Sequence, residues 1–259
     1  NVSVTATGGI TINDKIDADN ASSNDRTLTL TSGTGSTMTF GDAIGSSQPL
    51  AGLTITQSNG VTFASTLDIT DGSPGTLTVT DTEDGSDIVF NGAVTLETVS
   101  FAAAGYDLVF NGSGNTFANA ATFQNTGTLD LGNASGDTFV FDAGLTENTT
   151  GTVTLAGSID STNDDITFGA ITLATATTID TNASDTTGDI IIGAVTGANN
   201  NLTLDTTTST GSADITFNGD ISLGTGALDV TGDVVLGANV TLTTTKSSGN
   251  GIIFRDAIN

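Results

Sequence analysis

The chain has 259 residues, of which 29 are acidic and four are basic, so its net charge is −25. It contains no His, Cys or Trp, which excludes His-based triads, thiol catalysis, disulfides and Cys- or His-based metal sites. Four scattered bases cannot neutralise a polyanion, so we expect no nucleic-acid partner. No apolar run approaches the roughly 20 residues that span a bilayer, so we expect no membrane insertion. Hydrophobic residues nevertheless reach 36%, in alternating runs that indicate an ordered β protein rather than a disordered acidic tail.

A short motif recurs along the chain, and each copy has two apolar-x-apolar runs separated by a polar turn. The first clear copy reads TLTLTSGTGSTMTF and covers 27–40. Further copies follow in chain order at 76–90, 128–141, 152–168, 201–217 and 239–254. Alternation of apolar and polar residues has the period of a β-strand, and Thr, Val, Ile and Phe are favoured in strands. Gly, Asn, Asp and Ser lie between the runs, as in turns.

Weaker copies fill the gaps between the clear ones and define a repeat. The last apolar position of each copy falls, in order, at Ile12, Phe40, Phe63, Phe90, Phe110, Phe141, Phe168, Ile192, Phe217, Leu236 and Phe254. These positions are 18 to 31 residues apart, with a mean of about 24. A third apolar run usually follows, as in GDAI after Phe40 and NGAV after Phe90. The segment 95–106 fits the pattern least well, and we expect an outward loop there.

Three short strands in about 24 residues predict one coil of a parallel β-helix. One coil cannot bury its own apolar face, but stacked coils form a continuous core. The sequence therefore predicts an all-β protein with a single β-solenoid domain over 1–259, built from about 11 coils with three short strands each. A pair of antiparallel β-sandwich domains is the competing architecture. It fits less well, because the repeat is far shorter than a sandwich domain and the chain has no Trp and two Pro.

Aspartates recur just before the last apolar run in seven consecutive copies. They are Asp87, Asp107, Asp137, Asp165, Asp189, Asp214 and Asp233. If the coils stack, these carboxylates form a ladder at strand spacing, where like charges repel. Divalent cations relieve such repulsion and oxygen-only ligands suit Ca²⁺, so the ladder is a candidate calcium site. The alternative is that each aspartate caps a turn by bonding to backbone. Two local clusters are further candidates, one formed by Asp81, Glu83, Asp84 and Asp87 and one at 163–165.

Thr-x-Thr pairs recur on the predicted strands, for example at Thr27, Thr29 and Thr31. Both members of a pair point to the same face of a strand, here the outward one. Flat threonine arrays resemble the ice-binding faces of some β-solenoid antifreeze proteins, although those keep more regular coil lengths than the 18 to 31 residues found here. Threonine is also a good exposed strand residue, so the array alone does not establish ice binding.

For catalysis, the composition leaves a carboxylate pair as the remaining machinery, as in glycan-cleaving β-solenoids. Aspartates are so abundant that their spacing marks no particular pair. We therefore expect no enzymatic activity.

The segment FGDAIGSSQPLAGLTIT, which begins at Phe40 and follows TLTLTSGTGSTMT, resembles the repeats of filamentous-haemagglutinin-like adhesins and related β-strand-repeat proteins of bacterial surfaces. In that pattern Phe-x-x-Ala-Ile/Val-Gly is followed by Pro-Leu-x-x-Leu. Its full form occurs once, at 40–55, and shortened forms follow Phe90 and Phe254. The N-terminal secretion domain of the family, with its Asn-Pro motifs, is not recognisable. The resemblance implies a secreted or cell-surface β-helical stalk used in adhesion or matrix building, with a host or matrix ligand that it does not name.

We therefore predict a non-catalytic, extracellular or cell-surface stalk segment of a bacterial adhesin. The expected partners are neighbouring repeats of a longer protein, or other copies of the chain stacked end to end into a filament, because open solenoid ends are edge strands. Lys15, Lys246 and Arg255 lie near the ends of the repeat pattern, where bases on an acidic chain would assist such contacts. An ice-binding β-solenoid is the third alternative.

Overall fold

The computed structural model describes residues 1–19, 26–71, 74–181, 187–206 and 213–259. These residues contain β-strands and no helix, and the strands pair in parallel. The chain makes about ten turns at a spacing of about 24 residues, which confirms the predicted parallel β-solenoid. It forms two compact units: unit 1 comprises Asn1–Ala118, Thr122–Leu129 and Thr149–Gly151, and unit 2 comprises Asn119–Ala121, Asp130–Asn148 and Thr152–Asn259.

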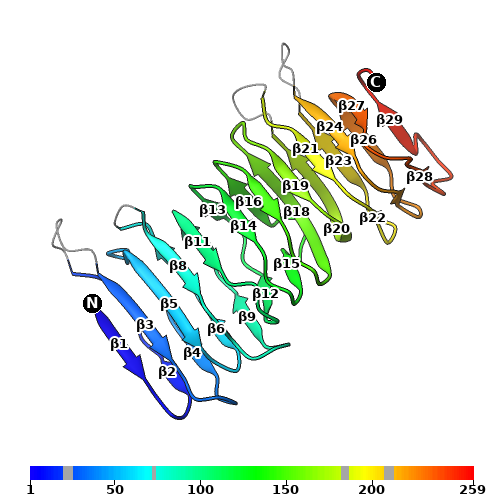
Figure 1. Ribbon diagram of the computed structural model, residues 1–259. Helices are drawn as coiled ribbons and strands as arrows, with labels where there is room; N and C mark the ends of the chain where they lie inside the picture. The colour runs from blue at the N-terminus through cyan, green and yellow to red at the C-terminus, as the bar shows by residue number, and fades with distance from the viewer. Residues whose placement is uncertain (20–25, 72–73, 182–186, 207–212) are drawn as a thin grey trace. The chain divides into compact units, whose positions relative to one another are not determined.

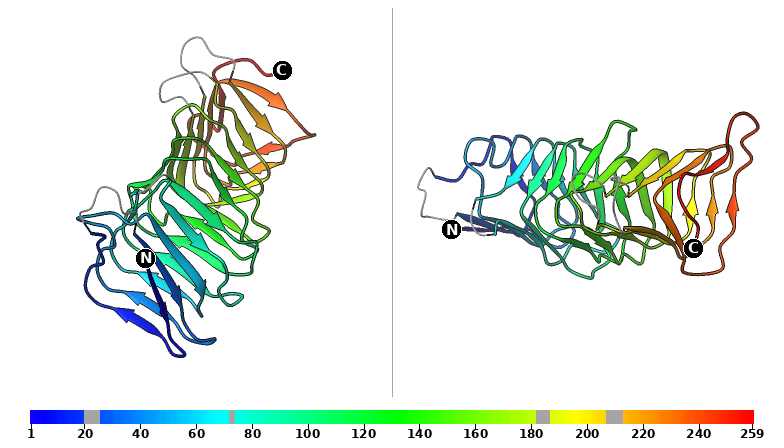
Figure 2. Two further views of the ribbon diagram at one scale, coloured as in Figure 1. Left: turned by 60° about the vertical axis from the view of Figure 1, so that its left-hand side comes forward. Right: turned by 90° about the horizontal axis from the view of Figure 1, so that it is seen from above.

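Each coil of unit 1 contributes strands to three parallel ladders (Figure 1 and Figure 2). The first ladder consists of β1 (Val2–Thr5), β3 (Thr27–Thr31), β5 (Gly52–Gln57), β8 (Thr76–Val79) and β11 (Thr98–Phe101). The second consists of β2 (Ile10–Ile12), β4 (Met38–Phe40), β6 (Val61–Phe63), β9 (Asp87–Phe90) and β12 (Asp107–Phe110). The third consists of β7 (Leu67–Ile69), β10 (Val94–Leu96) and β13 (Asn115–Phe117), continued by bridges at Ile16 and Ile44. Three short strands per coil are thus confirmed.

Stacked phenylalanine rings form the centre of unit 1. Phe40, Phe63, Phe90 and Phe110 are in register with Ile12, as predicted, and all four rings are buried. Successive ring centroids lie 4.9, 4.9 and 4.6 Å apart. Each coil thereby covers the aromatic side chain of the next, which is how a solenoid of short coils builds one core.

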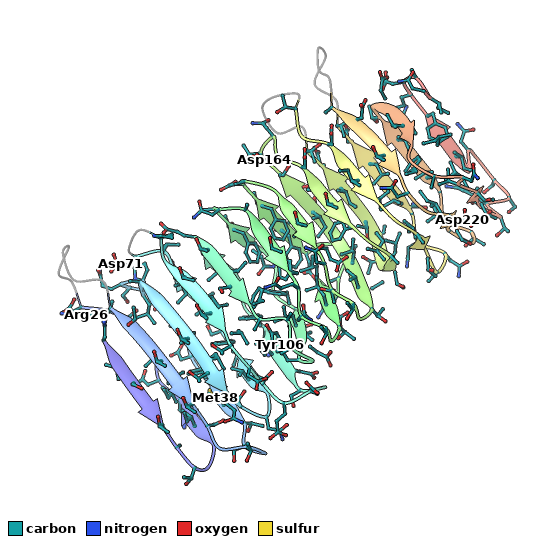
Figure 3. All side chains as sticks on the ribbon, in the orientation of Figure 1. Arg26, Met38, Asp71, Tyr106, Asp164 and Asp220 are labelled. Carbon is teal, nitrogen blue, oxygen red and sulfur yellow. The ribbon has the colours of Figure 1, made fainter. Side chains whose placement is uncertain are left out.

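The prediction of an outward loop at 95–106 is wrong. β11 occupies 98–101 and pairs in register with β8. Tyr106, labelled in Figure 3, is fully buried, and its hydroxyl donates a hydrogen bond to the carbonyl oxygen of Ala102 at 2.9 Å. The segment departs from the repeat because two aromatic side chains, Phe101 and Tyr106, fill the core where other coils use smaller residues.

Unit 2 also has three ladders. The first runs through β16 (Thr138–Phe141), the second halves of β18 (Val153–Ser161) and β20 (Ile171–Asp180), β23 (Leu202–Asp205), β26 (Leu228–Thr231) and β29 (Ile252–Phe254). The second runs through β17 (Leu145–Glu147), β19 (Ile166–Phe168), β21 (Ile190–Ile192), β24 (Asp214–Phe217) and β27 (Asp233–Leu236). The third runs through the first halves of β18 and β20, then β22 (Val195–Thr196), β25 (Ile221–Ser222) and β28 (Leu242–Thr243). β14 (Ala121–Phe123) and β15 (Leu129–Leu131) have residues in both units.

The single column expected for the last apolar positions divides in unit 2. Phe168, Ile192, Phe217 and Leu236 stay in register on the second ladder. Phe141 instead pairs with Ser161, and Phe254 pairs with Val230, on the first ladder. Each coil carries apolar-x-apolar runs on more than one face, so the pattern alone does not tell which face a run occupies.

β18 serves two ladders of unit 2, and Gly157 lies between its two halves. Its pairing with β20 shifts register between Leu155 and Gly157. Gly157 has a φ of 79°, in the left-handed region, and a Cβ at this position would lie 2.1 Å from the carbonyl oxygen of Asp137. Only glycine combines that backbone conformation with so close an approach.

Candidate functional site

Four of the predicted aspartates form a row at the start of the second ladder of unit 2. Asp165 Oδ1 accepts a hydrogen bond from the backbone N–H of Asp189, and Asp189 Oδ1 accepts one from the N–H of Asp214, each at 2.8 Å. Asp214 pairs in register with Asp233, whose Oδ1 accepts a hydrogen bond from the N–H of Ala257 at 3.1 Å. Three of these carboxylates therefore bond to a backbone N–H one coil further along the chain, which gives that donor a partner.

The other three predicted aspartates do not join this row. Asp87 and Asp107 pair in register in unit 1, and Asp107 accepts a hydrogen bond from the N–H of Thr128. Asp137, in unit 2, is buried, and its Oδ2 accepts hydrogen bonds from the N–H groups of Asn133 and Ala134, each at 2.8 Å. Asp137 thus closes its own turn. The seven aspartates divide in this way because the turns between the runs differ in length.

The pKa of Asp189 is raised, chiefly by burial and further by its neighbours in the row. Burial raises the pKa of Asp189 above its ordinary value, while the hydrogen bond from the Asp214 N–H works in the opposite direction. The charges of Asp165 and Asp214 raise that pKa further. The row therefore carries the like-charge repulsion on which the calcium hypothesis rests.

Calcium binding at the aspartates stays a prediction from the sequence. Over the residues that the structure describes, no three His, Cys, Asp or Glu side chains gather closely enough to hold a metal ion. A thermal melt with CaCl₂ and with a chelator tests the hypothesis. A rise in Tm with Ca²⁺ that Asp189→Asn removes would support the site, and identical melts would exclude it.

The two smaller acidic clusters also make contacts within the protein. Glu83 accepts a hydrogen bond from the N–H of Gly35 through Oε1, two coils away. Asp164, labelled in Figure 3, and Asp165 line a cavity of about 300 Å³ in unit 2. Ala120, Ala121, Ala143 and Gly144 also line it, and Asp164 and Asp165 are the only acidic residues among the described ones in the lining.

A second acidic row lies on the first ladder of unit 2, where the sequence pattern did not predict one. Asp160, Asp180 and Asp205 follow one another in register on β18, β20 and β23. Burial raises the pKa of Asp160, although the hydroxyl of Ser158 donates a hydrogen bond to it at 2.6 Å and works in the opposite direction. Arg255 forms a bidentate ion pair with Asp229 on the same ladder, with N–O distances of 2.9 and 2.6 Å.

A signal for this second row was present in the sequence. Each of its members directly follows an inward aliphatic residue at the end of a strand, as in Ile159–Asp160, Ile179–Asp180 and Leu204–Asp205. The seven predicted aspartates stand before an apolar run, whereas Asp160, Asp180 and Asp205 follow one.

The first ladder of unit 1 presents a face of a different chemistry. Five hydroxyl side chains stand in register across its five strands, one on each of β1, β3, β5, β8 and β11: Ser3, Thr29, Thr54, Thr78 and Ser100. A neighbouring column consists of Thr27, Gly52, Thr76 and Thr98. The five strands contain no charged residue, although the chain has 29 acidic ones.

The edge strands of the two units expose apolar side chains. In unit 1, β1 pairs with β3 and leaves Val2 59% exposed. Val2, Val4, Ile12, Leu28 and Leu50 contribute to the lining of a cavity of about 370 Å³ beside this strand. In unit 2, β29 pairs with β26, and Leu236 and Ile258 are 49% and 53% exposed.

No family model, curated protein or solved structure matches the chain. In the described part of the chain, no helix is long and apolar enough to cross a membrane.

Proposed function

We propose that the chain is a non-catalytic structural segment, a β-helical stalk of a secreted or cell-surface bacterial adhesin. The observation that carries the proposal is the register of the apolar columns, coil after coil, in both units. Such a column allows coils to be added without changing the packing of those already present, which suits a spacer of extended reach. The resemblance of 40–55 to adhesin repeats supports the same role.

The side-chain chemistry favours a structural role over a catalytic one. Three carboxylates of the Asp165 row bond to a backbone N–H on the adjacent coil, and Asp137 closes a turn. In each case a carboxylate oxygen serves as the acceptor of a hydrogen bond that holds the backbone, which supports a role in the fold. The glycan-cleaving alternative would require a carboxylate pair held apart across an open groove.

A display experiment tests the stalk. The chain is placed on a bacterial surface between a membrane anchor and an epitope tag, and the tag is measured after treatment with proteinase K. We expect the tag to persist, because stacked coils keep the backbone hydrogen-bonded and inaccessible. Rapid loss of the tag through cleavage within the described coils would contradict the proposal. Release of reducing sugars from polysaccharides would favour the enzymatic alternative.

The exposed edge strands favour a second candidate function, end-to-end association with other copies. Edge strands with exposed Val2, Leu236 and Ile258 are templates for further pairing. Sedimentation over a range of concentrations tests this, with Val2→Lys/Ile258→Lys as the variant and Thr62→Lys, on β6, as the control. We expect larger species that the edge variant loses and the control retains. A monomer at all concentrations would contradict self-assembly and leave the stalk proposal standing.

A further inference from the structure

We propose that the outward face of β1, β3, β5, β8 and β11 in unit 1 binds ice. We call this surface the hydroxyl face. It consists of the column Ser3, Thr29, Thr54, Thr78 and Ser100 and the neighbouring column Thr27, Gly52, Thr76 and Thr98. The proposal goes beyond the stalk function and does not depend on it.

The hydroxyl face is a two-dimensional lattice of small groups. Parallel strands place residues of one column about 4.8 Å apart, and residues two apart on a strand are separated by about 6.7 Å. Figure 1 shows the five strands side by side. The oxygen atoms of an ice surface repeat over distances of similar size in two directions. A regular array of hydroxyls and methyls can therefore match many lattice positions at once.

The coil lengths of the chain vary, but the hydroxyl face stays regular. Along its ladder Val2, Leu28, Leu53 and Leu77 succeed one another in register, and the extra residues of longer coils lie in the turns. The one irregularity is a register shift after Leu30, where Thr31 pairs with Gln57. It lies at the border of the ladder and leaves the column through Thr29 and Thr54 intact. The irregular spacing of the repeats therefore does not count against ice binding.

The groups on this face suit a neutral lattice of water molecules. The five strands lack charged side chains, which would hold hydration shells of their own; Arg26 and Glu97 lie just outside, before β3 and β11. Threonine is stiff at χ1, so little side-chain entropy is lost when it is held against a surface. Over the described residues, the hydroxyls of Thr29, Thr54 and Thr78 have no hydrogen-bond partner in the protein. They are available to water.

A crystalline polysaccharide is the other flat, neutral ligand for such a face. Flat sugar rings are bound by exposed aromatic side chains, which present apolar area together with a rigid plane. The sole aromatic residue of these strands is Phe101, and it is buried. The composition of the face therefore favours ice.

The test measures uptake of the full chain, fused to a fluorescent protein, into a slowly growing ice front. Thr29→Lys/Thr54→Lys introduces two charges into the column of the hydroxyl face that runs from Ser3 to Ser100. The matched control is Thr62→Lys, because Thr62 is also a half-buried outward threonine of unit 1 but lies on the second ladder, on β6. Circular dichroism checks that each variant is folded. Thr78→Lys replaces the double variant if that one does not fold.

We expect the wild-type fusion and Thr62→Lys to enter the ice, and the variant of the hydroxyl face to be excluded like the fluorescent protein alone. Exclusion of the wild type, or equal uptake of all variants, overturns the proposal. Binding to cellulose powder that Thr29→Lys/Thr54→Lys abolishes, without uptake into ice, overturns it in favour of a polysaccharide ligand. Resistance of the displayed chain to proteinase K remains a separate readout, so failure of the stalk proposal is distinguishable from failure of this one.

Discussion

Unit 1 stacks four phenylalanine rings at the last inward position of its second ladder. The same position in the second ladder of unit 2 is mixed and holds Phe168, Ile192, Phe217 and Leu236. The outward faces differ even more. The first ladder of unit 1 carries hydroxyls and no charge, while the first ladder of unit 2 carries Asp160, Asp180 and Asp205. The same coil thus tolerates different inner and outer side chains, provided that inward positions are apolar and each strand stays in register. The fold constrains the core, and the outward faces are free to differ in chemistry.

The largest effect is expected where the aromatic column of unit 1 is interrupted. Phe63 lies between Phe40 and Phe90 at 4.9 Å from each, and it is 2% exposed. Phe63→Ala should lower the free energy of unfolding by about 4 kcal/mol, since the lost burial and the remaining cavity both count. Ile190→Ala in unit 2 should cost about 3 kcal/mol. Urea denaturation measures both, and the surface variant Thr62→Ala is the control.

Equal and small losses for Phe63→Ala and Thr62→Ala would contradict the stacked core of unit 1. A Phe63→Leu variant sharpens the comparison further, because it places an aliphatic side chain between two phenylalanines, as Ile192 lies between Phe168 and Phe217 in unit 2. It should recover about half of the loss, because most of the cavity is then filled.

The second effect concerns how a strand turns the corner between two ladders. In unit 2, β18 has Gly157 between its two halves, with a φ of 79°, whereas the register shift of unit 1 at Thr31 and Gln57 lies within one ladder and involves no glycine. Gly157→Ala should cost about 2 to 3 kcal/mol, because alanine is strained at positive φ and its Cβ would meet the Asp137 carbonyl oxygen. Gly136→Ala is the control, since a Cβ there meets nothing within 4 Å. Similar unfolding free energies for the two variants would show that β18 does not need a glycine between its two halves.

Much of this fold could be predicted from the sequence, because period-two runs repeating at about 24 residues permit few architectures. The column from Ile12 to Phe110 is in register as predicted. The prediction was wrong at Phe141 and Phe254, where runs of the same type lie on the first ladder and not the second. The alternation of apolar and polar residues identifies which side chains point inward. The ladder that a strand joins depends on how many residues lie in the turns before it. For the same reason the seven predicted aspartates divide into a row of four, the pair Asp87 and Asp107, and Asp137, which closes a turn.

A third prediction separates the structural role of the aspartate row from its charge. Asp189→Ala removes the acceptor for the Asp214 N–H and should cost about 1 kcal/mol. Asp189→Asn keeps an oxygen acceptor and removes the repulsion from Asp165 and Asp214, so its stability at pH 7 should equal or exceed that of the wild type. Thermal and urea unfolding of the two variants give the comparison. Equal destabilisation by both would mean that the negative charge itself is needed, as a bound cation would require.

The smallest expected effect is the dependence of stability on pH. Its sign differs between carboxyl groups of unit 2 and one of unit 1. In unit 2 the pKa of Asp160 and that of Asp189 are raised, mainly by burial. A folded state with a raised carboxyl pKa binds protons more tightly than the unfolded chain, so these groups destabilise the protein at pH 7. That penalty is relieved as the pH falls through the raised pKa. In unit 1 the pKa of Asp17 is lowered, chiefly by the hydrogen bond from the Ser47 N–H. Its stabilising contribution is therefore complete above the ordinary carboxyl pKa and is lost as the pH falls through the lowered pKa.

Asp160→Asn tests this difference directly. The variant should be more stable than the wild type at pH 7 by about 0.5 kcal/mol, a modest value because the side chain is partly exposed and screened by water. The advantage should vanish in acid, where the wild-type carboxyl is protonated as well. An Asp17→Asn variant should show the opposite sign, with lower stability at pH 7 and a difference that shrinks as the pH falls toward the lowered pKa of Asp17. Urea unfolding at pH 7 and pH 3 measures both variants. If Asp160→Asn is less stable at pH 7, the Asp160 carboxylate makes interactions that outweigh the cost of burying its charge, and the opposite signs expected for the two units do not hold.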